Sequence, residues 1–317
     1  MIYYIVNSFA GSGKPDAAAP IIEEVTRARG QAYSMIYTKK PADSDRIGGL
    51  IDWPAAKAVV CVGGDGTVQE YTRMAVDGGK PFGVIPVGSA NDLLYSLPAR
   101  GTEASPPGKA PPGRKAPGGA RARFRTFEEK VAFYTGKAIE GRTMPVDAVS
   151  VNGGRCFLNI GGTGMDIQVL MDALPLKKRF GGGAYFLSLI KNAASYKAEE
   201  MTLTIDGRAQ TRKYSLLAFC NGSCYGGRMR IAPGALMDDG FLTICVVTRV
   251  PMLKMMAIFP LVKPGWHTGF REVSFINAKT AKLEFEGVKT INFDGNLWEY
   301  ESPVEFTLLE GAIDFIV

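Results

Sequence analysis

The chain contains 317 residues, enough for two domains of roughly 150 residues each. Hydrophobic residues make up 46% and charged residues 21% of the chain, a composition that excludes a disordered protein and is typical of an ordinary globular one. The formal net charge is +6, and the chain has one histidine, His267. A Ser-His-Asp triad would have to use His267, and sites built from several histidines are excluded.

The cysteines and the apolar runs indicate a cytoplasmic location. None of the five cysteines has the Cys-x-x-Cys spacing, and four lie in apolar runs, where a thiol packs as a small hydrophobic group. The N-terminal segment MIYYIVNSFAGSGK has no basic region, and its apolar run is too short for a signal peptide or a membrane span. A second apolar run, residues 250–262, is interrupted by Lys254 and Pro260. We therefore expect a chain that does not cross a membrane.

The positive charge is concentrated in residues 99–125, ARGTEASPPGKAPPGRKAPGGARARFR. This segment holds seven Lys and Arg side chains against a single acid, Glu103, so the rest of the chain is balanced in charge. It is rich in Pro and Gly, and its one large apolar residue, Phe124, cannot offset the entropy of ordering. We predict a disordered surface insert, which is either an inert spacer or a tether to anionic phospholipid. Since no aromatic residues are interleaved with the charges, nucleic acid is not an expected partner.

The first part of the chain alternates strands with helices. The predicted strands are residues 2–6, 57–62 and 82–85, and helical character follows at 21–28, from Thr67 onward and from about Leu93. Thr67 and Glu70 have the Thr-x-x-Glu spacing of a capping box, which predicts that Thr67 caps this helix directly after the glycines. Such alternation predicts a doubly wound parallel sheet, which binds ligands at the carboxyl ends of its strands.

After about residue 140 the pattern changes to a series of strands. The segment MTLTIDGRAQTRKYSLLAFC is typical of two strands around an Asp206-Gly207 turn. Further strand patterns are GFLTICVV, EVSFI, AKLEFE, KTINFDG and VEFTLLEGAIDFIV. A helical pattern at residues 184–196 interrupts them. The second half is therefore predicted to be a mainly antiparallel β domain, a sandwich or a flattened barrel.

A glycine-rich turn follows the second of the predicted N-terminal strands, with the sequence Gly63-Gly64-Asp65-Gly66-Thr67. Without Cβ atoms, the backbone can adopt positive φ and approach a ligand closely. The N–H groups at the start of the following helix are donors for a phosphate. The motif predicts an anion-binding turn, although taken alone it also fits a plain tight turn with Asp65 in solvent.

Two more polar loops are expected at the same edge of the sheet, at residues 7–14 and 86–92. Residues 8–14 resemble a Walker loop, but Ser8 stands where the first Gly belongs and Pro15 where the final Ser or Thr belongs. A P-loop NTPase is therefore disfavoured. The Gly-x-Gly-x-x-Gly pattern is absent from the first turn, which argues against a dinucleotide dehydrogenase.

Together these segments resemble the diacylglycerol kinase catalytic-domain family, the lipid kinases that include bacterial soluble enzymes and the sphingosine kinases. The resemblance runs nearly end to end, through NSFAGSGK (7–14), Thr38, GGDGTVQE (63–70), PVGSANDL (86–93), FLNIGGTGMD (157–166), IAPGALMDDGFLTICVV (231–247) and NFDG (292–295). The GGDGT segment is also found in NAD kinases and 6-phosphofructokinases, whereas the PVGSAND and APGALMDDG segments are not.

The resemblance implies an N-terminal α/β domain that binds ATP with Mg²⁺, a C-terminal β-sandwich domain, and a lipid site in the cleft between them. The expected boundaries are residues 1–138 for the nucleotide-binding domain, 139–302 for the β-sandwich, and 303–317 for a final segment that returns to the first domain. By position, the nucleotide-binding residues would be Asn7, Thr38, Gly63, Gly64, Asp65, Gly66, Thr67, Val68, Gln69, Glu70, Gly88, Ser89 and Asn91. Asp65 would be the central carboxylate, which holds metal or orients the acceptor.

The family also binds a structural Mg²⁺ in its β domain. In this sequence that ion maps to the Asp239 carboxylate with the backbone carbonyls of Leu236 and Phe241. Ligation by oxygen alone suits this hard cation. The segment Asp238-Asp239-Gly240, taken by itself, is typical of a hairpin turn.

One departure from the family lies at Asp294-Gly295-Asn296, where the family has Asp-Gly-Glu with a carboxylate as general base. An amide at Asn296 cannot accept a proton. Activity is retained if Asp294 acts as the base, or if it positions the hydroxyl through Asp65. Otherwise the chain is slow or inactive, unless Glu299 or Glu301 reaches the site.

The function predicted from this resemblance is an ATP-dependent lipid kinase that phosphorylates a lipid hydroxyl, converting diacylglycerol to phosphatidic acid. It would act in the cytoplasm as a peripheral protein at the inner membrane surface, with a lipid substrate and anionic phospholipid as partners. Two alternatives stay open, a soluble-metabolite kinase of the NAD kinase type and a catalytically impaired protein that binds nucleotide or lipid. The sequence leaves open the acceptor lipid and the oligomeric state, including a homodimer.

Overall fold

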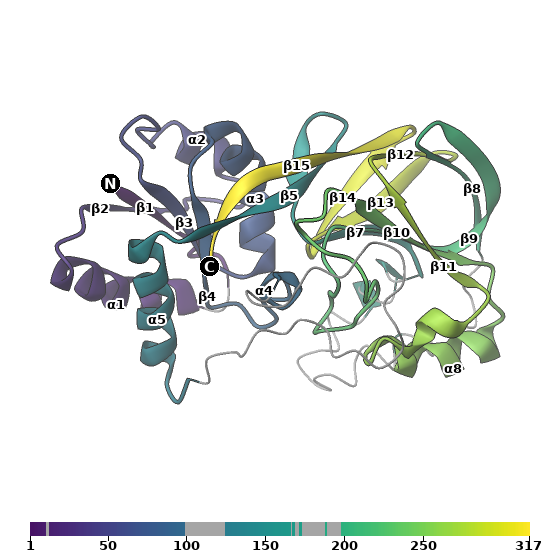
Figure 1. The fold of residues 1–317 in the computed structure, drawn as a ribbon, viewed down its shortest axis with the longest axis horizontal. Helices are drawn as coiled ribbons and strands as arrows, with labels where there is room; N and C mark the ends of the chain where they lie inside the picture. Colours follow the sequence, from purple (N-terminus) through teal and green to yellow (C-terminus); the bar gives the residue numbers. More distant parts are fainter. Residues whose placement is uncertain (11–12, 99–123, 166, 169–170, 173–187, 189–197) are drawn as a thin grey trace.

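The structure is a computed structural model that describes residues 1–10, 13–98, 124–165, 167–168, 171–172, 188 and 198–317 (Figure 1). The predicted helix at 184–196 lies outside the described residues except for position 188, and the basic insert lies outside them except for Phe124 and Arg125. An N-terminal α/β domain and a C-terminal mostly antiparallel β-sandwich lie side by side along the long axis, as the sequence predicts.

The N-terminal sheet has four parallel strands in the order β2-β1-β3-β4. Their bounds are β1 (Ile2–Val6), β2 (Tyr33–Tyr37), β3 (Ala58–Gly63) and β4 (Phe82–Pro86). Every residue of β1, β3 and β4 is buried, because helices cover both faces of the sheet. The doubly wound parallel sheet predicted from the sequence is thus confirmed.

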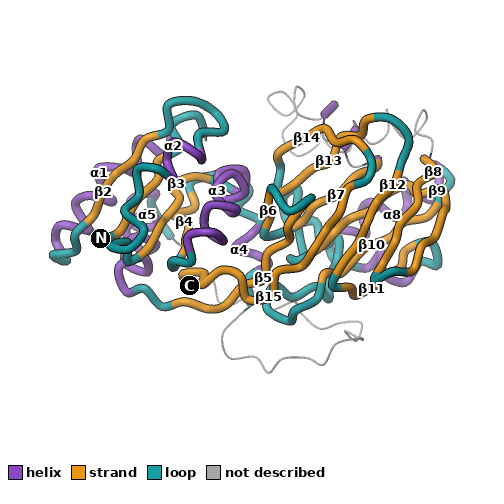
Figure 2. Tube along the Cα trace, turned by 90° about the horizontal axis from the view of Figure 1, so that it is seen from above, coloured by secondary structure: helices purple, strands orange, loops and turns teal. Residues whose placement is uncertain are grey.

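Alternate residues of each strand enter different cores. On one face, Tyr4 packs in a core with Ile22 and Val131, which come from α1 and α5. On the other face, Tyr3 packs in a core with Tyr71, which comes from α3. The helices are α1 (Lys14–Ala28), α2 (Ser44–Gly48), α3 (Asp65–Gly78), the single turn α4 (Leu93–Ser96) and α5 (Phe127–Glu140). Seen from above, α3 lies between the parallel sheet and the sandwich (Figure 2).

The predicted start of α3 is wrong by two residues. The helix begins at Asp65, and Gly64 is its N-cap in an extended conformation (φ −118°, ψ −167°). Thr67 is already helical, and its hydroxyl accepts a hydrogen bond from Asn7 Nδ2 (3.1 Å). Glu70 accepts one from the Asp43 amide (2.7 Å). Both side chains of the apparent capping box therefore bond to other loops, a competition that local sequence cannot show.

The described strands of the β-sandwich all pair antiparallel with one another. They are β5 (Thr143–Val151), β6 (Arg155–Phe157), β7 (Ile160–Gly164), β8 (Glu199–Ile205), β9 (Arg208–Cys220), β10 (Leu242–Thr248), β11 (Val273–Ala278), β12 (Thr280–Glu284), β13 (Val288–Phe293), β14 (Asn296–Glu301) and β15 (Val304–Ile316). Their core holds stacked aromatic rings, with Phe219 on Phe306 at 3.8 Å and Phe157 on Phe293 at 5.2 Å between centroids.

The predicted hairpin at Asp206-Gly207 is confirmed, since β8 and β9 meet there and both turn residues have positive φ (44° and 83°). The apolar run at 250–262 forms helix α8 (Met252–Val262), followed by the short helix η2 (Trp266–Gly269). Among the described residues, no helix is long and apolar enough to cross a membrane.

Strand β15 connects the two domains. It pairs antiparallel with β5 and β12, and its Phe315 pairs parallel with Phe82 of β4. In Figure 1 it is the long yellow strand that ends beside β4. The boundary predicted at residue 138 falls inside α5, and the boundary predicted at 302 falls between β14 and β15.

Candidate functional site

The loops that follow β1, β3 and β4 touch one another at one edge of the parallel sheet. The amides of Val87 and Gly88 both donate to the carbonyl of Gly63 (2.9 and 3.1 Å). The amide of Asn7 donates to the carbonyl of Val62 (3.3 Å). The structure therefore brings together the three loops that the sequence singles out.

Two glycines allow this close approach. A Cβ on Gly88 would lie 2.5 Å from the Cα of Gly64, and a Cβ on Gly63 would lie 2.3 Å from Thr67 Oγ1. Both distances are too short for real atoms, so a side chain at position 88 would force the β3 and β4 loops apart, and one at position 63 would displace the side chain of Thr67. The glycines are required here because backbone packs directly against other atoms.

The start of α3 offers backbone donors to an anion. Its N-cap, Gly64, has no side-chain cap, and the amides of Gly64 and Gly66 form no hydrogen bond with any part of the chain that the structure describes. Helix starts carry unpaired N–H groups and a partial positive charge, which suit a phosphate. The geometry therefore fits the predicted phosphate-binding turn.

Asp65 occupies the first position of α3 and links it to α4. Its Oδ1 accepts from the amide of Leu93 and its Oδ2 from the amide of Asp92, both at 3.0 Å. Each oxygen keeps a second lone pair for a ligand. Burial raises the pKa of Asp65 above its usual value, although these two hydrogen bonds act in the opposite direction.

The predicted nucleotide-binding side chains Asn7, Thr38 and Thr67 contact one another. Asn7 donates to Thr67 Oγ1 (3.1 Å), while the Thr38 hydroxyl donates to Asn7 Oδ1 (3.5 Å) and accepts from the amide of Ser8 (3.2 Å). The side chain of Val68 packs into the core, so a nucleotide could meet only its backbone. These contacts bring β1, β2 and α3 together at one point.

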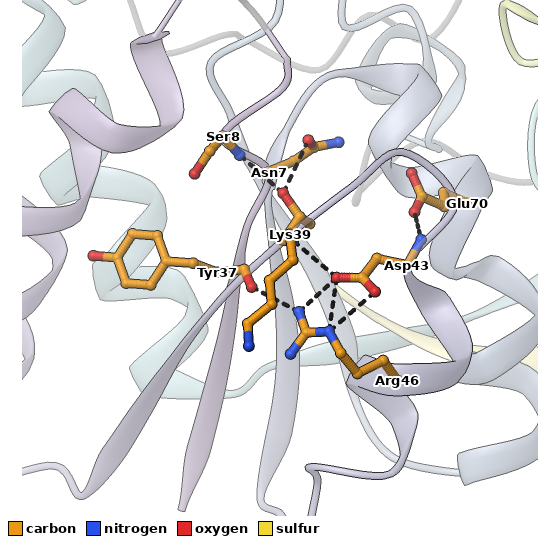
Figure 3. Close-up of polar contacts among 8 residues, drawn as sticks. Asn7, Ser8, Tyr37, Lys39, Asp43, Arg46 and Glu70 are labelled. Carbon is orange, nitrogen blue, oxygen red and sulfur yellow. Dashed lines mark hydrogen bonds and ion pairs between the residues drawn. The ribbon is translucent and has the colours of Figure 1, made fainter.

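Sequence reasoning missed an ion pair beside these residues, in which the aspartate is buried and the arginine is partly exposed (Figure 3). Arg46 binds Asp43 through Nε (2.9 Å) and Nη2 (2.5 Å), and it also donates to the carbonyl of Tyr37 (2.8 Å). Asp43 accepts from the amide of Lys39 (2.9 Å), and its own amide donates to Glu70 (2.7 Å). The Arg46 guanidinium holds the pKa of Asp43 below its usual value. The only sequence signal for the pair is its i, i+3 spacing.

The loop after β4 holds the remaining predicted nucleotide-binding residues. Asn91 has positive φ (53°), and its Nδ2 donates to the carbonyl of Gly88 (2.8 Å). Its Oδ1 is buried and has no hydrogen-bond partner in the described structure. Ser89 is exposed at the tip of the same loop. A ligand with a donor group could satisfy the orphaned oxygen of Asn91.

Asp294 lies in the turn between β13 and β14, with φ 48°. Its carboxylate accepts hydrogen bonds from the amides of Leu158 (2.9 Å), Asn159 (3.1 Å) and Ile160 (2.7 Å). Burial raises the pKa of Asp294 to about 7 against the effect of these three donors, and the nearby Asp65 adds to the rise. Asp294 therefore holds the chain between β6 and β7 in place and has little capacity left for a substrate.

Asn296 connects the sandwich to the α/β domain. Its Nδ2 donates to the carbonyl of Gly66 (3.0 Å) and to Oε1 of Gln69 (2.7 Å), both on α3. Gln69 in turn donates to the carbonyl of Cys156 (3.4 Å). The amide thus places the β13–β14 turn directly against the start of α3, where a carboxylate would face two acceptor oxygens.

The two glutamates considered as substitutes for the family base lie farther along β14. Glu299 and Glu301 are both exposed, and Glu301 pairs with Val288 at the far end of the hairpin. A strand rises by about 3.3 Å per residue, so Glu301 is roughly 16 Å along the strand from Asn296. Neither side chain is placed to act at the start of α3.

The predicted structural metal residues lie in the loop before β10. Asp239 Oδ1 accepts from the amide of Phe241 (3.0 Å), while burial raises the pKa of Asp239 to about 6, with contributions from Asp147 and Asp238. Asp147 is bound by the amides of Gly240 and Gly311. Searched over the described residues alone, no three His, Cys, Asp or Glu side chains are placed to hold one ion. A cation here would depend on backbone carbonyls, and the assignment to Asp239, Leu236 and Phe241 stays a prediction.

Two family profiles match the chain. The diacylglycerol kinase catalytic domain matches residues 1–110, and the YegS C-terminal NAD kinase beta sandwich-like domain matches residues 160–317.

Named relatives agree with these profiles. A diacylglycerol kinase of Bacillus subtilis (strain 168) is 23% identical over 264 residues, which are 82% of this chain and 77% of the relative. A YegS-like lipid kinase of Chromohalobacter salexigens is 26% identical over 311 residues, which are 95% and 90% of the two chains. The crystal structure of a diacylglycerol kinase from Bacillus anthracis str. Sterne superposes with a TM-score of 0.72 at 22% identity, covering 99% of this chain and 96% of that one, which shows the shared fold.

Proposed function

The chain belongs to the diacylglycerol kinase family of lipid kinases, and we propose that it transfers the γ-phosphoryl group of ATP to the hydroxyl of a diacylglycerol, forming phosphatidic acid. One observation carries the proposal: Asn296 ties the sandwich to Gly66 and Gln69, next to the unpaired amides of α3. A phosphate bound at those amides would lie where the β13–β14 turn of the sandwich contacts the start of α3. Relatives named diacylglycerol kinase favour diacylglycerol as the acceptor.

In phosphoryl transfer the protein contributes mainly positioning and charge neutralisation. The amides of Gly64 and Gly66 would hold phosphate oxygens. Bound Mg²⁺ would neutralise charge on the β- and γ-phosphates, and it favours oxygen ligands while keeping several waters. The two free lone pairs of the Asp65 carboxylate fit such an ion, which needs only one or two protein ligands beside the phosphates.

Asp65 is also the carboxylate best placed to take the proton of the acceptor hydroxyl. Each oxygen of Asp294 already accepts two hydrogen bonds, because the amide of Asn159 contacts both oxygens, and the amide of Asn296 cannot accept a proton. Asp65 keeps one free lone pair on each oxygen, so one oxygen could accept that proton while the other contacts Mg²⁺. The loss of the family glutamate at position 296 is therefore compatible with activity.

We further propose that the protein works at the cytoplasmic surface of the inner membrane, with residues 99–125 as a tether to anionic lipid. Phe124, at the end of this segment, packs on Phe133 of α5 at 5.2 Å between ring centroids. Deletion of residues 101–123 should weaken binding to vesicles that contain anionic phospholipid, without lowering the melting temperature. Unchanged vesicle binding would contradict the tether.

Transfer from γ-labelled ATP with Mg²⁺ tests the main proposal, using dioctanoylglycerol, NAD or no acceptor. We expect the natural chain to transfer label to the lipid. Asn296→Glu should transfer label at a reduced rate, and Asp65→Asn should transfer none. Label in NAD alone would favour the soluble-metabolite alternative. Nucleotide binding without transfer to any lipid would identify the chain as a catalytically impaired member.

A further inference from the structure

The loop between β9 and β10 contains an unusual backbone at Arg228. Three successive residues, Gly226, Gly227 and Arg228, have positive φ values of 60°, 86° and 72°. The turn is closed by paired backbone hydrogen bonds between Tyr225 and Met229 (3.0 and 2.9 Å). Glycine adopts this region freely, but a long side chain at positive φ is strained. Such strain is typical of functional sites, where a side chain is kept in spite of its cost.

This turn is held against the α/β domain through Asp92. The carboxylate of Asp92 accepts from the amides of Gly227 and Arg228, each at 2.8 Å. The amide of Asp92 donates to Oδ2 of Asp65 (3.0 Å). Arg228 is therefore connected to the proposed catalytic carboxylate by two consecutive hydrogen-bonded links.

The side chain of Arg228 is oriented by Tyr95. The centre of its guanidinium lies 4.0 Å from the centroid of the Tyr95 ring, a cation–π distance. Tyr95 is part of α4, and the first amide of α4, that of Leu93, donates to Oδ1 of Asp65. The guanidinium is thus attached to the same short helix that fixes Asp65.

Within the part of the chain that the structure describes, no carboxylate neutralises the charge of Arg228. Arg228 is exposed, and it forms no ion pair with any residue that the structure describes. The nearest acid along its hydrogen bonds, Asp92, is occupied by two backbone amides. A guanidinium that is held against Tyr95 and has no carboxylate partner among the described residues is suited to a phosphate, because its planar fork matches phosphate oxygens.

We propose that the Arg228 guanidinium binds a phosphate group where its loop meets α4 of the α/β domain, during phosphoryl transfer. The inference rests on the kinase activity proposed above. The phosphate has two sources with the same chemistry, the γ-phosphoryl group of ATP and the phosphate of the phosphorylated lipid. In either case the guanidinium stabilises charge close to Asp65, and this contact explains why a strained arginine occupies the turn.

Three substitutions separate charge from backbone strain. Arg228→Ala removes the guanidinium and keeps a side chain at positive φ, Arg228→Gly removes both, and Arg228→Lys keeps the charge without the fork. We expect kcat/KM for lipid phosphorylation to fall about tenfold or more in Arg228→Ala and Arg228→Gly alike, and by less in Arg228→Lys. The melting temperature of Arg228→Gly should exceed that of Arg228→Ala, because glycine relieves the strain.

Arg230 provides a matched control on the same loop. Its amide donates to the carbonyl of Val262, and its Cβ lies close to Gly265, on the side of α8. Arg230→Ala removes the same charge from the same loop and should leave kcat/KM unchanged. An equal loss in Arg230→Ala and Arg228→Ala would show a general effect of net charge and would overturn the proposal.

Titrations of the full-length protein distinguish the source of the phosphate and do not require turnover. Weaker binding of the β,γ-imido analogue of ATP by Arg228→Ala, with unchanged binding of ADP, would assign the contact to the γ-phosphoryl group. Weaker binding of dioctanoyl phosphatidic acid alone would assign it to the lipid phosphate. If natural and variant chains bind both probes equally and have equal kcat/KM, the proposal is overturned. A natural chain that phosphorylates no lipid would refute the proposed function, and these titrations would still decide the role of Arg228.

Discussion

Two aspartates, one from each domain, lie close enough to interact electrostatically, and they differ in what surrounds their carboxylate oxygens. Asp65, at the start of α3, accepts two amide hydrogen bonds and keeps a lone pair on each oxygen. Asp294, in the β13–β14 turn, accepts from the amides of three successive residues. Asp65 can therefore still accept hydrogen bonds from a ligand or coordinate a cation. The oxygens of Asp294 are already bound by the chain between β6 and β7.

This difference indicates that the two domains make different contributions to the candidate site. The α/β side supplies free donors and a carboxylate with spare capacity, because helix α3 starts at a loop without a side-chain cap. The sandwich side supplies shape and the amide of Asn296, which holds α3 in place. Substitution of Asp65 should therefore affect catalysis, and substitution of Asp294 should affect stability.

The largest effect is expected from Asp65→Asn. The amide retains an oxygen for one of the two backbone donors but loses the proton acceptor, so kcat should fall by about 1000-fold. Steady-state transfer from labelled ATP to dioctanoylglycerol measures it, with the melting temperature as a check on folding. If the activity of Asp65→Asn is within tenfold of that of the natural chain, another residue accepts the proton. The proposed difference in role between Asp65 and Asp294 would then be wrong.

Asp294→Asn should act on stability. Its side-chain NH₂ would face backbone N–H donors, so we expect a loss of about 3 kcal/mol in the free energy of unfolding. Chemical denaturation at neutral pH measures this loss. Asp314→Asn, an exposed aspartate on β15, is the matched control and should change the free energy by less than about 0.5 kcal/mol.

The pH dependence of unfolding gives a second test of Asp294. Its pKa rises from 3.8 to about 7 on folding, so between these values the folded chain holds a proton that the unfolded chain has released. The contribution of Asp294 to the free energy of unfolding should therefore fall as pH rises from about 4 to about 7. Measured by denaturation at a series of pH values, the free energy of unfolding should fall more steeply between about pH 4 and pH 7 in the natural chain than in Asp294→Asn. Above pH 7 the two slopes should be equal. A parallel pH profile for the two chains would contradict the raised pKa.

A smaller effect is expected from Asp43→Asn, which weakens the ion pair with Arg46. The pair holds the chain around Thr38 and the amide that binds Glu70, so KM for ATP should rise about tenfold while kcat changes little. Stability should fall by about 2 kcal/mol, because Arg46 is left partly buried without its partner. Asp45→Asn, an exposed neighbour on α2, should change neither quantity. A fall in kcat without a rise in KM would place Asp43 in another role.

The smallest effect is expected from Lys279→Ala, which breaks an ion pair with Glu310 (2.8 Å) on the surface of the sandwich. Both side chains are half exposed or more, so solvent screens the pair. The free energy of unfolding should change by less than about 0.5 kcal/mol. A loss of unfolding free energy comparable to that of Asp43→Asn would show that burial does not determine how much each ion pair contributes to stability.

Much of the fold is predictable because its signals are local. The apolar runs at residues 2–6, 57–62 and 82–85 become β1, β3 and β4, since a strand buried on both faces must be apolar throughout. Strand β2 escapes sequence analysis because it is a half-buried edge strand of mixed polarity. Helix α8 is apolar along most of its length and contains a lysine and a proline, so it lacks the helical periodicity from which a helix would be predicted.

By itself, the sequence determined the parallel sheet, its three glycine-bearing loops and the departure at Asn296, because runs, turns and single residues are properties of neighbouring positions. Only the tertiary structure decided what each polar side chain contacts. In the structure, the Thr67 hydroxyl accepts a hydrogen bond from Asn7 and does not cap the helix. Backbone amides occupy the oxygens of Asp294, whereas Asp65 keeps free lone pairs. The Arg228 guanidinium lies over the Tyr95 ring. The physical reason is that hydrogen bonds act over short distances and each oxygen accepts only a few of them. A donor more than a hundred residues away in the sequence can therefore occupy an oxygen, and no local sequence pattern shows this.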